Sequence, residues 1–153
     1  MAIQFLDQRL STFLIDSSGS GSISDTPTLI GDIGLQVVAA QLVPEHLTSV
    51  RVSLTGMAGI ITNPEADASI TLCIEKNGTN TLGSGTVIFR EDFDTNFIPA
   101  FSPLAVIAGD FPTAAEVSAG QIRYTLFASS TGVPLTLNGP VTFNGSASTG
   151  TTT

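Results

Sequence analysis

The sequence predicts an all-β protein, a jelly-roll sandwich of about eight antiparallel strands. Apolar and polar residues alternate with a period of two, as they do where successive side chains of a strand point to opposite faces. Turn residues separate these runs at the spacing that is typical of sandwiches and barrels. Finally, 42% of the 153 residues are hydrophobic and only 12% are charged, so one domain has ample apolar content for a core.

The alternation is clearest in three segments, "TSVRVSLTG" (48–56), "ASITLCIEKNG" (68–78) and "GQIRYTLFAS" (120–129). Each predicts a half-buried strand with one apolar face and one more polar face. The only helix-like stretches are short, at 45–50 and 112–120. Shorter apolar runs predict further strands at 35–43, 85–90, 103–111, 133–137 and 140–146.

Glycine and asparagine mark the turns between the strands. Asn77-Gly78 predicts a tight hairpin, because both central residues of a type I′ turn need positive φ. We also expect turns at 138–140 ("NGP") and at Asn144-Gly145. The second site also matches the N-glycosylation acceptor pattern, which is frequent by chance in chains rich in threonine and glycine, so we interpret it as a turn.

The N-terminal segment predicts a separate docking arm. We divide the chain into an apolar arm (1–16), a Gly/Ser-rich flexible linker (17–26), a jelly-roll domain (27–148) and a polar tail (149–153). The arm is interrupted by charges and does not match a secretory leader. Its apolar residues, which we predict to serve in assembly, are Ile3, Phe5, Leu6, Leu10, Phe13, Leu14 and Ile15.

The form and the partner of this arm stay open. Spacings of three and four from Leu6 onward fit a short amphipathic helix, whereas "IQF" and "TFLI" fit strands that add to a sheet edge. The favoured interpretation is docking on a neighbouring subunit. The arm could instead pack on its own domain as an extra strand, or anchor the protein to a different surface.

Charge and cysteine content exclude several classes of function. The chain has 13 acidic and 5 basic residues, a formal net charge of −8, so we expect no binding to nucleic acid or to anionic membranes. No apolar run approaches the ~20 residues of a membrane span. Cys73 is the only cysteine, which excludes an intrachain disulfide and leaves an interchain one open.

The residues that catalysis would need are scarce. His46 is the only histidine and lies in a predicted loop, so we expect a surface or capping role, no catalytic residues and no zinc site. Residues 90–97 begin like a calcium loop, but Phe97 and Pro103 stand where that loop needs glycine and glutamate. We therefore predict a non-enzymatic protein with no metal and no cofactor.

Phenylalanines are concentrated in "FREDFDTNFIPAF" (89–101). Phe93, Phe97 and Phe101 cannot all point inward from one sheet face, so we predict a possible intersubunit contact there. The alternative is that they pack under a long loop.

Two segments resemble a known family. "VSAGQIRYTLFASSTGVPLTLNGPVTFNGSAS" (117–148) and "ASITLCIEKNGTNTLGSGTVIF" (68–89) are similar to the C1q/TNF-like domains of bacterial endospore surface proteins. These include exosporium glycoprotein C-terminal domains, exosporium basal-layer proteins and spore appendage fibre subunits. The resemblance implies a TNF-like jelly roll that forms a homotrimer and has no enzymatic activity. The collagen-like stalk of those glycoproteins is missing from this sequence.

Together these features predict a structural subunit of a fibre or appendage on the spore surface, with trimers joined through the N-terminal arm. Its partners would be copies of itself and possibly a spore-surface anchor protein, without nucleic acid or membrane. The alternative is a trimeric head domain of a phage or cell-surface assembly that binds a receptor or glycan.

Overall fold

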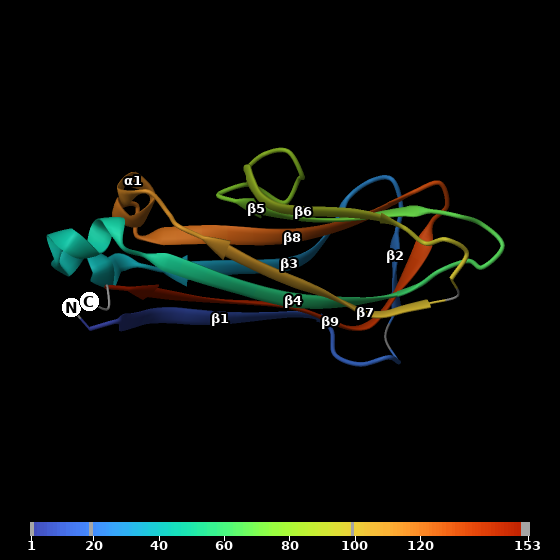
Figure 1. Cartoon of the computed structure of the whole chain (residues 1–153), viewed down its shortest axis with the longest axis horizontal. Helices are drawn as coiled ribbons and strands as arrows, with labels where there is room; N and C mark the ends of the chain where they lie inside the picture. Colours follow the sequence, from blue (N-terminus) through green and yellow to red (C-terminus); the bar gives the residue numbers. More distant parts are fainter. Residues whose placement is uncertain (1, 19, 99, 151–153) are drawn as a thin grey trace.

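The computed structural model describes residues 2–18, 20–98 and 100–150, except the side chains of residues 100–102. Two antiparallel sheets pack face to face as a sandwich (Figure 1). One sheet has the order β1-β9-β4-β7, with β2 paired to the end of β9, and the other has the order β3-β8-β5-β6. Neighbouring strands are mostly distant in sequence, so the predicted all-β jelly roll is confirmed.

Most of the predicted strands are present, but no strand was predicted over residues 28–34. The strands are β1 (Gln4–Leu14), β2 (Ser20–Ile23), β3 (Thr28–Gln36), β4 (Arg51–Ile61), β5 (Ser69–Lys76), β6 (Thr86–Asp94), β7 (Ala100–Asp110), β8 (Gln121–Thr131) and β9 (Leu135–Thr149). Two short 3₁₀ helices, η1 (Val38–Leu42) and η2 (Pro44–Thr48), connect β3 to β4, and helix α1 (Ala114–Ser118) precedes β8. Segment 35–43 therefore leaves the strand conformation after Gln36.

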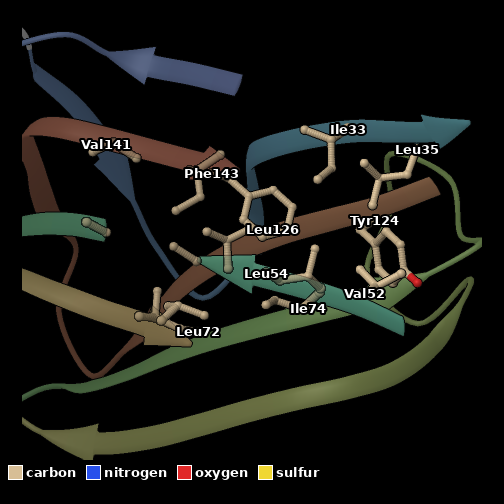
Figure 2. Packing of buried hydrophobic residues seen from close by; sticks show 14 of the residues in the cluster. Ile33, Leu35, Val52, Leu54, Leu72, Ile74, Tyr124, Leu126, Val141 and Phe143 are labelled. Atoms are coloured by element: carbon tan, nitrogen blue, oxygen red, sulfur yellow. The ribbon is translucent and has the colours of Figure 1, made fainter. Parts of the chain in front are cut away.

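The core lies between the two sheets. Figure 2 shows that Leu54 and Phe143 from one sheet meet Leu72, Leu126 and other side chains from the opposite sheet. These four residues are fully buried, as the period-two pattern requires of the inward face. Interdigitation of the two inner faces is what holds a sandwich together.

Strand β5 is buried on both faces, although its sequence predicts one polar face. The loop after β5 explains the difference, because backbone N–H groups of Gly83 and Gly85 donate hydrogen bonds to the Glu75 carboxylate at 2.6 and 3.1 Å. The outward face of β5 also carries Cys73, which is buried as expected of a small strand residue. Burial, the main cause, raises the pKa of the Cys73 thiol.

The division into a separate arm and linker is wrong. β1 pairs with β9 from Gln4 opposite Thr149 to Leu14 opposite Val141, and β2 pairs with the earlier part of β9. Without β1, this edge of β9 would expose a row of unpaired N–H and C=O groups. The domain therefore begins with β1, and the segment is a strand of its own sheet rather than a helix or a free arm.

Three local predictions also change. β5 and β6 do form a hairpin and Asn77 has a positive φ of 56°, but residues 77–85 connect the strands instead of a two-residue turn.

The predicted turns at 138–140 and at Asn144-Gly145 lie inside β9. There Gly145 is needed for close packing, since a Cβ would lie 2.6 Å from Ile33 Cδ1. His46 is buried in η2 rather than at the surface.

Candidate assembly surface

The outward face of the sheet β1-β9-β4-β7 is the strongest candidate for a functional surface. Strand register aligns Leu10, Asn144, Thr55 and Ile107 in one row across all four strands. The next row contains Gln8, Ser146, Ser53 and Gly109. Their strand neighbours Leu54, Val106, Phe143 and Gly145 are buried, so these two rows face outward.

In these two rows small polar residues lie at the centre of the face, and the first row has large apolar residues at its edges. β9 and β4 supply the polar residues, although β4 also exposes Met57 farther along the same face. Leu10 on β1 is 72% exposed, and Ile107 on β7 is 74% exposed. Phe5 lies exposed on the β1 side, and Phe111 lies exposed directly after β7. We call Phe5 with Leu10 the β1 patch, and Ile107 with Phe111 the β7 patch.

The seven apolar residues predicted for the arm divide into two groups. Leu6 and Leu14 pack against the core, because register irregularities between Phe5 and Asp7 and between Thr12 and Leu14 interrupt the alternation. The other five residues are exposed: Ile3, Phe5, Leu10, Phe13 and Ile15. Their role as contacts with a second subunit stays a prediction.

The phenylalanine cluster is also divided. Phe93, on β6, packs against the core of its own domain. Phe97 is exposed and has a positive φ of 59°. The side chain of Phe101 lies outside the described residues.

Sequence reasoning missed the β7 patch. Residues 103–108 ("PLAVIA") are apolar throughout, so alternation could not separate the buried Val106 from the exposed Ile107. Leu42 on η1, which is 81% exposed, was missed because its segment was predicted to be a strand. The sequence offered one useful signal. Pro103 has no backbone N–H to donate to a neighbouring strand, which indicates that 103–111 is an edge strand.

A polar seam fixes β1 in place beside the other sheet. The Gln36 backbone N–H donates to the Asp7 carboxylate at 2.8 Å, and the Asp32 N–H donates to Ser11 Oγ at 3.2 Å. Burial opposes ionisation of Asp7, but the hydrogen bonds from Gln36 and Arg9 outweigh it and hold the pKa of Asp7 below its usual value. These side chains satisfy N–H groups on the free edge of β3, so β1 closes one side of the sandwich.

Other kinds of site find little support among the residues that the structure describes. They contain no group of three or more His, Cys, Asp or Glu side chains that could hold a metal ion. Within the same residues, no helix has the length and apolarity that crossing a membrane requires. Asp92 of the failed calcium pattern accepts hydrogen bonds from Arg90 and Thr71 instead.

Comparison with known proteins identifies the fold but no family. No family matches the sequence, and no curated protein is similar to it. Among solved structures, dimeric latent PorU from Porphyromonas gingivalis is similar with a TM-score of 0.54 and 12% identity, over 95% of this chain and 13% of that chain. A chain of T=1 particles derived from infectious bursal virus has a TM-score of 0.53 and 9% identity, over 92% of this chain and 31% of that chain.

A third similar structure is the Eiger TNF from S. frugiperda, with a TM-score of 0.45 and 15% identity, over 93% of this chain and 91% of that chain. The chain thus spans about a third or less of the PorU and viral chains that it matches. At these identities the likeness concerns the fold alone, a two-sheet jelly roll.

Proposed function

We propose that this protein is a structural subunit that assembles with copies of itself into a homotrimer, and that the trimers join into a fibre on the bacterial spore surface. The observation that carries the self-assembly is the pair of unlike apolar patches at opposite edges of one sheet face. The spore surface, the fibre and the trimeric state rest on the resemblance of segments 68–89 and 117–148 to endospore surface domains.

The two patches allow a head-to-tail contact. The β1 patch and the β7 patch differ and lie on opposite edges of one face, so the β1 patch of one subunit can contact the β7 patch of the next. This contact forms a closed ring where its rotation closes after three subunits. A two-fold dimer that stacks the two faces would pair the same patches reciprocally, so the choice of a ring rests on the trimer that the family resemblance implies. Small polar residues of β9 and β4 lie between the patches in the rows of Leu10 and Gln8, and Met57 of β4 is exposed farther along the same face.

The binding free energy of one such contact is sufficient for stable assembly only when the subunits close into a ring. Burying four large apolar side chains contributes about 1.5–3 kcal/mol each, or about 6–12 kcal/mol for one contact. Association costs about 4–15 kcal/mol in lost freedom of motion, so one contact alone is marginal. In a closed trimer each subunit takes part in two contacts, and the second forms at a high effective concentration.

Contacts between trimers would use the end of the sandwich where both termini and η1 lie (Figure 1). Ile3 and Leu42 are exposed large apolar residues of these segments, and neither belongs to the proposed ring contact. A spore-surface anchor protein could meet the same end. The function requires no catalytic group, in keeping with a non-enzymatic role.

Sedimentation velocity and negative-stain microscopy test this proposal. The wild-type chain should sediment as trimers or larger assemblies at micromolar concentration, and fibres should be visible. L10E and I107E should each yield folded monomers, because a buried unpaired carboxylate is costly. V87E is the matched control, since Val87 is also an exposed strand residue but lies on β6 of the other sheet.

Each part of the proposal has its own contrary result. A monomeric wild-type chain refutes the trimer, and trimers that survive in L10E and I107E refute the proposed contact. Discrete trimers without fibres favour the receptor- or glycan-binding head instead. Fibres that persist in I3E and L42E exclude the termini end as the contact between trimers. Removing residues 1–16 would not be a clean test, because it deletes β1 from the sheet.

A further inference from the structure

Lys76, the only lysine in the chain, is buried at the end of β5. Its side chain is 9% exposed. Lysine is almost never buried without a partner, because its charge loses hydration. The position of this side chain therefore depends on the groups around it.

Two carboxylates from different elements enclose the Lys76 amine. Nζ lies 3.0 Å from Asp110 Oδ2 at the end of β7 and 3.1 Å from Glu116 Oε1 on α1. It lies 3.2 Å from the second oxygen of each carboxylate. The Tyr124 hydroxyl of β8 donates a hydrogen bond of 2.7 Å to the same Asp110 Oδ2. One amine, two carboxyl groups and one phenol thus form a cluster that is largely shielded from water.

Glu116 is held in a defined orientation. It belongs to a capping box at the start of α1, in which the Thr113 backbone N–H donates to Glu116 Oε2 at 2.7 Å. The Asn77 side-chain amide donates to Glu116 Oε1 at 3.3 Å. Glu116 therefore faces the amine without needing to move, while Asp110 contacts the amine and the phenol.

We propose that Lys76 and Asp110 join in an intramolecular isopeptide bond, formed by the folded protein itself. The Lys76 amine attacks the Asp110 carboxyl carbon, a C–N bond forms, and one carboxyl oxygen leaves as water. Starting from the ammonium and carboxylate forms, Nζ loses two protons and both end on the departing oxygen. The products are one amide and one water, so the step needs no oxidant, reductant or co-reactant.

The neighbours have distinct roles in this step. Glu116 accepts a proton from Nζ and delivers it to the leaving oxygen, as a general base and then a general acid. The Tyr124 hydroxyl donates to the oxygen that becomes negative in the tetrahedral intermediate. Burial and the nearby Asp110 raise the pKa of Tyr124, so the phenol keeps its proton as a donor.

The resting ion pair favours the ammonium form of Lys76, so the amine must lose a proton to the cluster before it attacks. Burial alone would lower the pKa of Lys76, but hydrogen bonds to Asp110 and Glu116 outweigh it and raise that pKa. Proton transfer within the cluster reaches the neutral amine without an external base. Effective molarities of well-oriented intramolecular reactions reach on the order of 10⁵–10⁸ M, so holding the two groups side by side accelerates the attack.

The bond would link the two sheets covalently. Lys76 belongs to β5 of the sheet β3-β8-β5-β6, whereas Asp110 ends β7 of the opposite sheet. A chain with one cysteine cannot form an internal disulfide, so an amide is the covalent staple that remains possible. Reducing agents would not break it. This inference is independent of the proposed fibre.

Intact-mass spectrometry of the purified wild-type chain tests the bond. The expected mass is that of the sequence less one water. Trypsin should then fail to cleave after Lys76, and residues 52–90 should appear linked to 91–123. A wild-type chain with the full sequence mass, or a water loss that maps to other residues, overturns the proposal.

Variants separate the bond from the roles of its neighbours. K76R keeps a cation beside both carboxylates but should show its full sequence mass. D110N should lose ammonia instead of water and yield the same linked peptide as wild type. E116Q, with wild-type circular dichroism, should stay unlinked, because an amide does not relay the proton. Full linkage in E116Q overturns the role of Glu116, and linkage in K76R overturns the assignment to Lys76.

Discussion

Gly31 in β3 faces Phe143 of β9 across the interior of the sandwich, and the variant G31A tests how closely the two sheets pack there. A Cβ at Gly31 would lie 2.5 Å from Phe143 Cβ and 2.8 Å from Phe143 Cδ1. Both distances are far inside van der Waals contact. Phe143 is fully buried, so its ring cannot swing into solvent to make room.

The expected cost follows from two opposing effects. Overpacking a core by one methyl group costs about 1–3 kcal/mol. Gly31 does not have a positive φ, so alanine brings no backbone strain and restricts the unfolded chain, which stabilises by about 0.4–1 kcal/mol. We expect a net loss of about 1–2 kcal/mol in the free energy of unfolding. With a urea m-value of about 2 kcal/mol/M, the unfolding midpoint should fall by about 0.5–1 M.

Urea unfolding followed by circular dichroism, at one fixed protein concentration, measures this change. G109A is the matched control, because a Cβ at Gly109 meets only the Val52 carbonyl oxygen at 3.7 Å. That variant should be as stable as wild type or more stable by about 0.5–1 kcal/mol. In the double variant G31A/F143L, the cost of G31A should shrink, since the smaller side chain leaves room for the methyl group. Equal stability of G31A and G109A would refute the packing of Phe143 on Gly31.

Three further predictions concern the β1 seam, the thiol and the helix cap. D7A should lower the free energy of unfolding by about 1–2 kcal/mol, because the Gln36 N–H loses its acceptor. Folding lowers the pKa of Asp7, so the difference in free energy of unfolding between wild type and D7A should be fully present above pH ~4. It should shrink as the pH falls through the folded-state pKa of Asp7, and acid titration of both proteins would measure this. Cys73 should resist thiol reagents until urea unfolds the chain, and rapid labelling of the native protein would contradict its burial. T113A should lower the free energy of unfolding by about 1 kcal/mol, measured by thermal unfolding, because it removes the hydroxyl that donates to and accepts from Glu116. T113S keeps a hydroxyl and should retain most of this stabilisation.

The strands of the core were predictable because alternation is a local property. Segment 68–78 contains β5, and segments 48–56 and 120–129 contain the first part of β4 and most of β8, as their period of two indicates. The turn signals were less reliable. Asn144-Gly145 has the composition of a turn, but its glycine serves the close approach of Ile33 in the middle of a long strand.

The assembly surface was only partly predictable. Exposure of Phe5 and Leu10 agrees with their selection as contact residues, but the same reasoning selected Leu6, which register irregularity turns toward the core. Ile107 could not be recognised, because an apolar run carries no information on which side chains face outward. The cluster around Lys76 was equally hidden, since its carboxylates are 34 and 40 residues away in the chain.

By itself, then, the sequence determined that this protein is an all-β sandwich with a large apolar core, a strong negative charge and no internal disulfide. These properties depend on composition and on the side-chain period of single strands. Only the tertiary structure decided that residues 4–14 complete the sheet of their own domain, and that Lys76 lies between Asp110 and Glu116. The reason is physical: the open edge of β9 and the meeting of β5, β7 and α1 exist only after distant segments have come together.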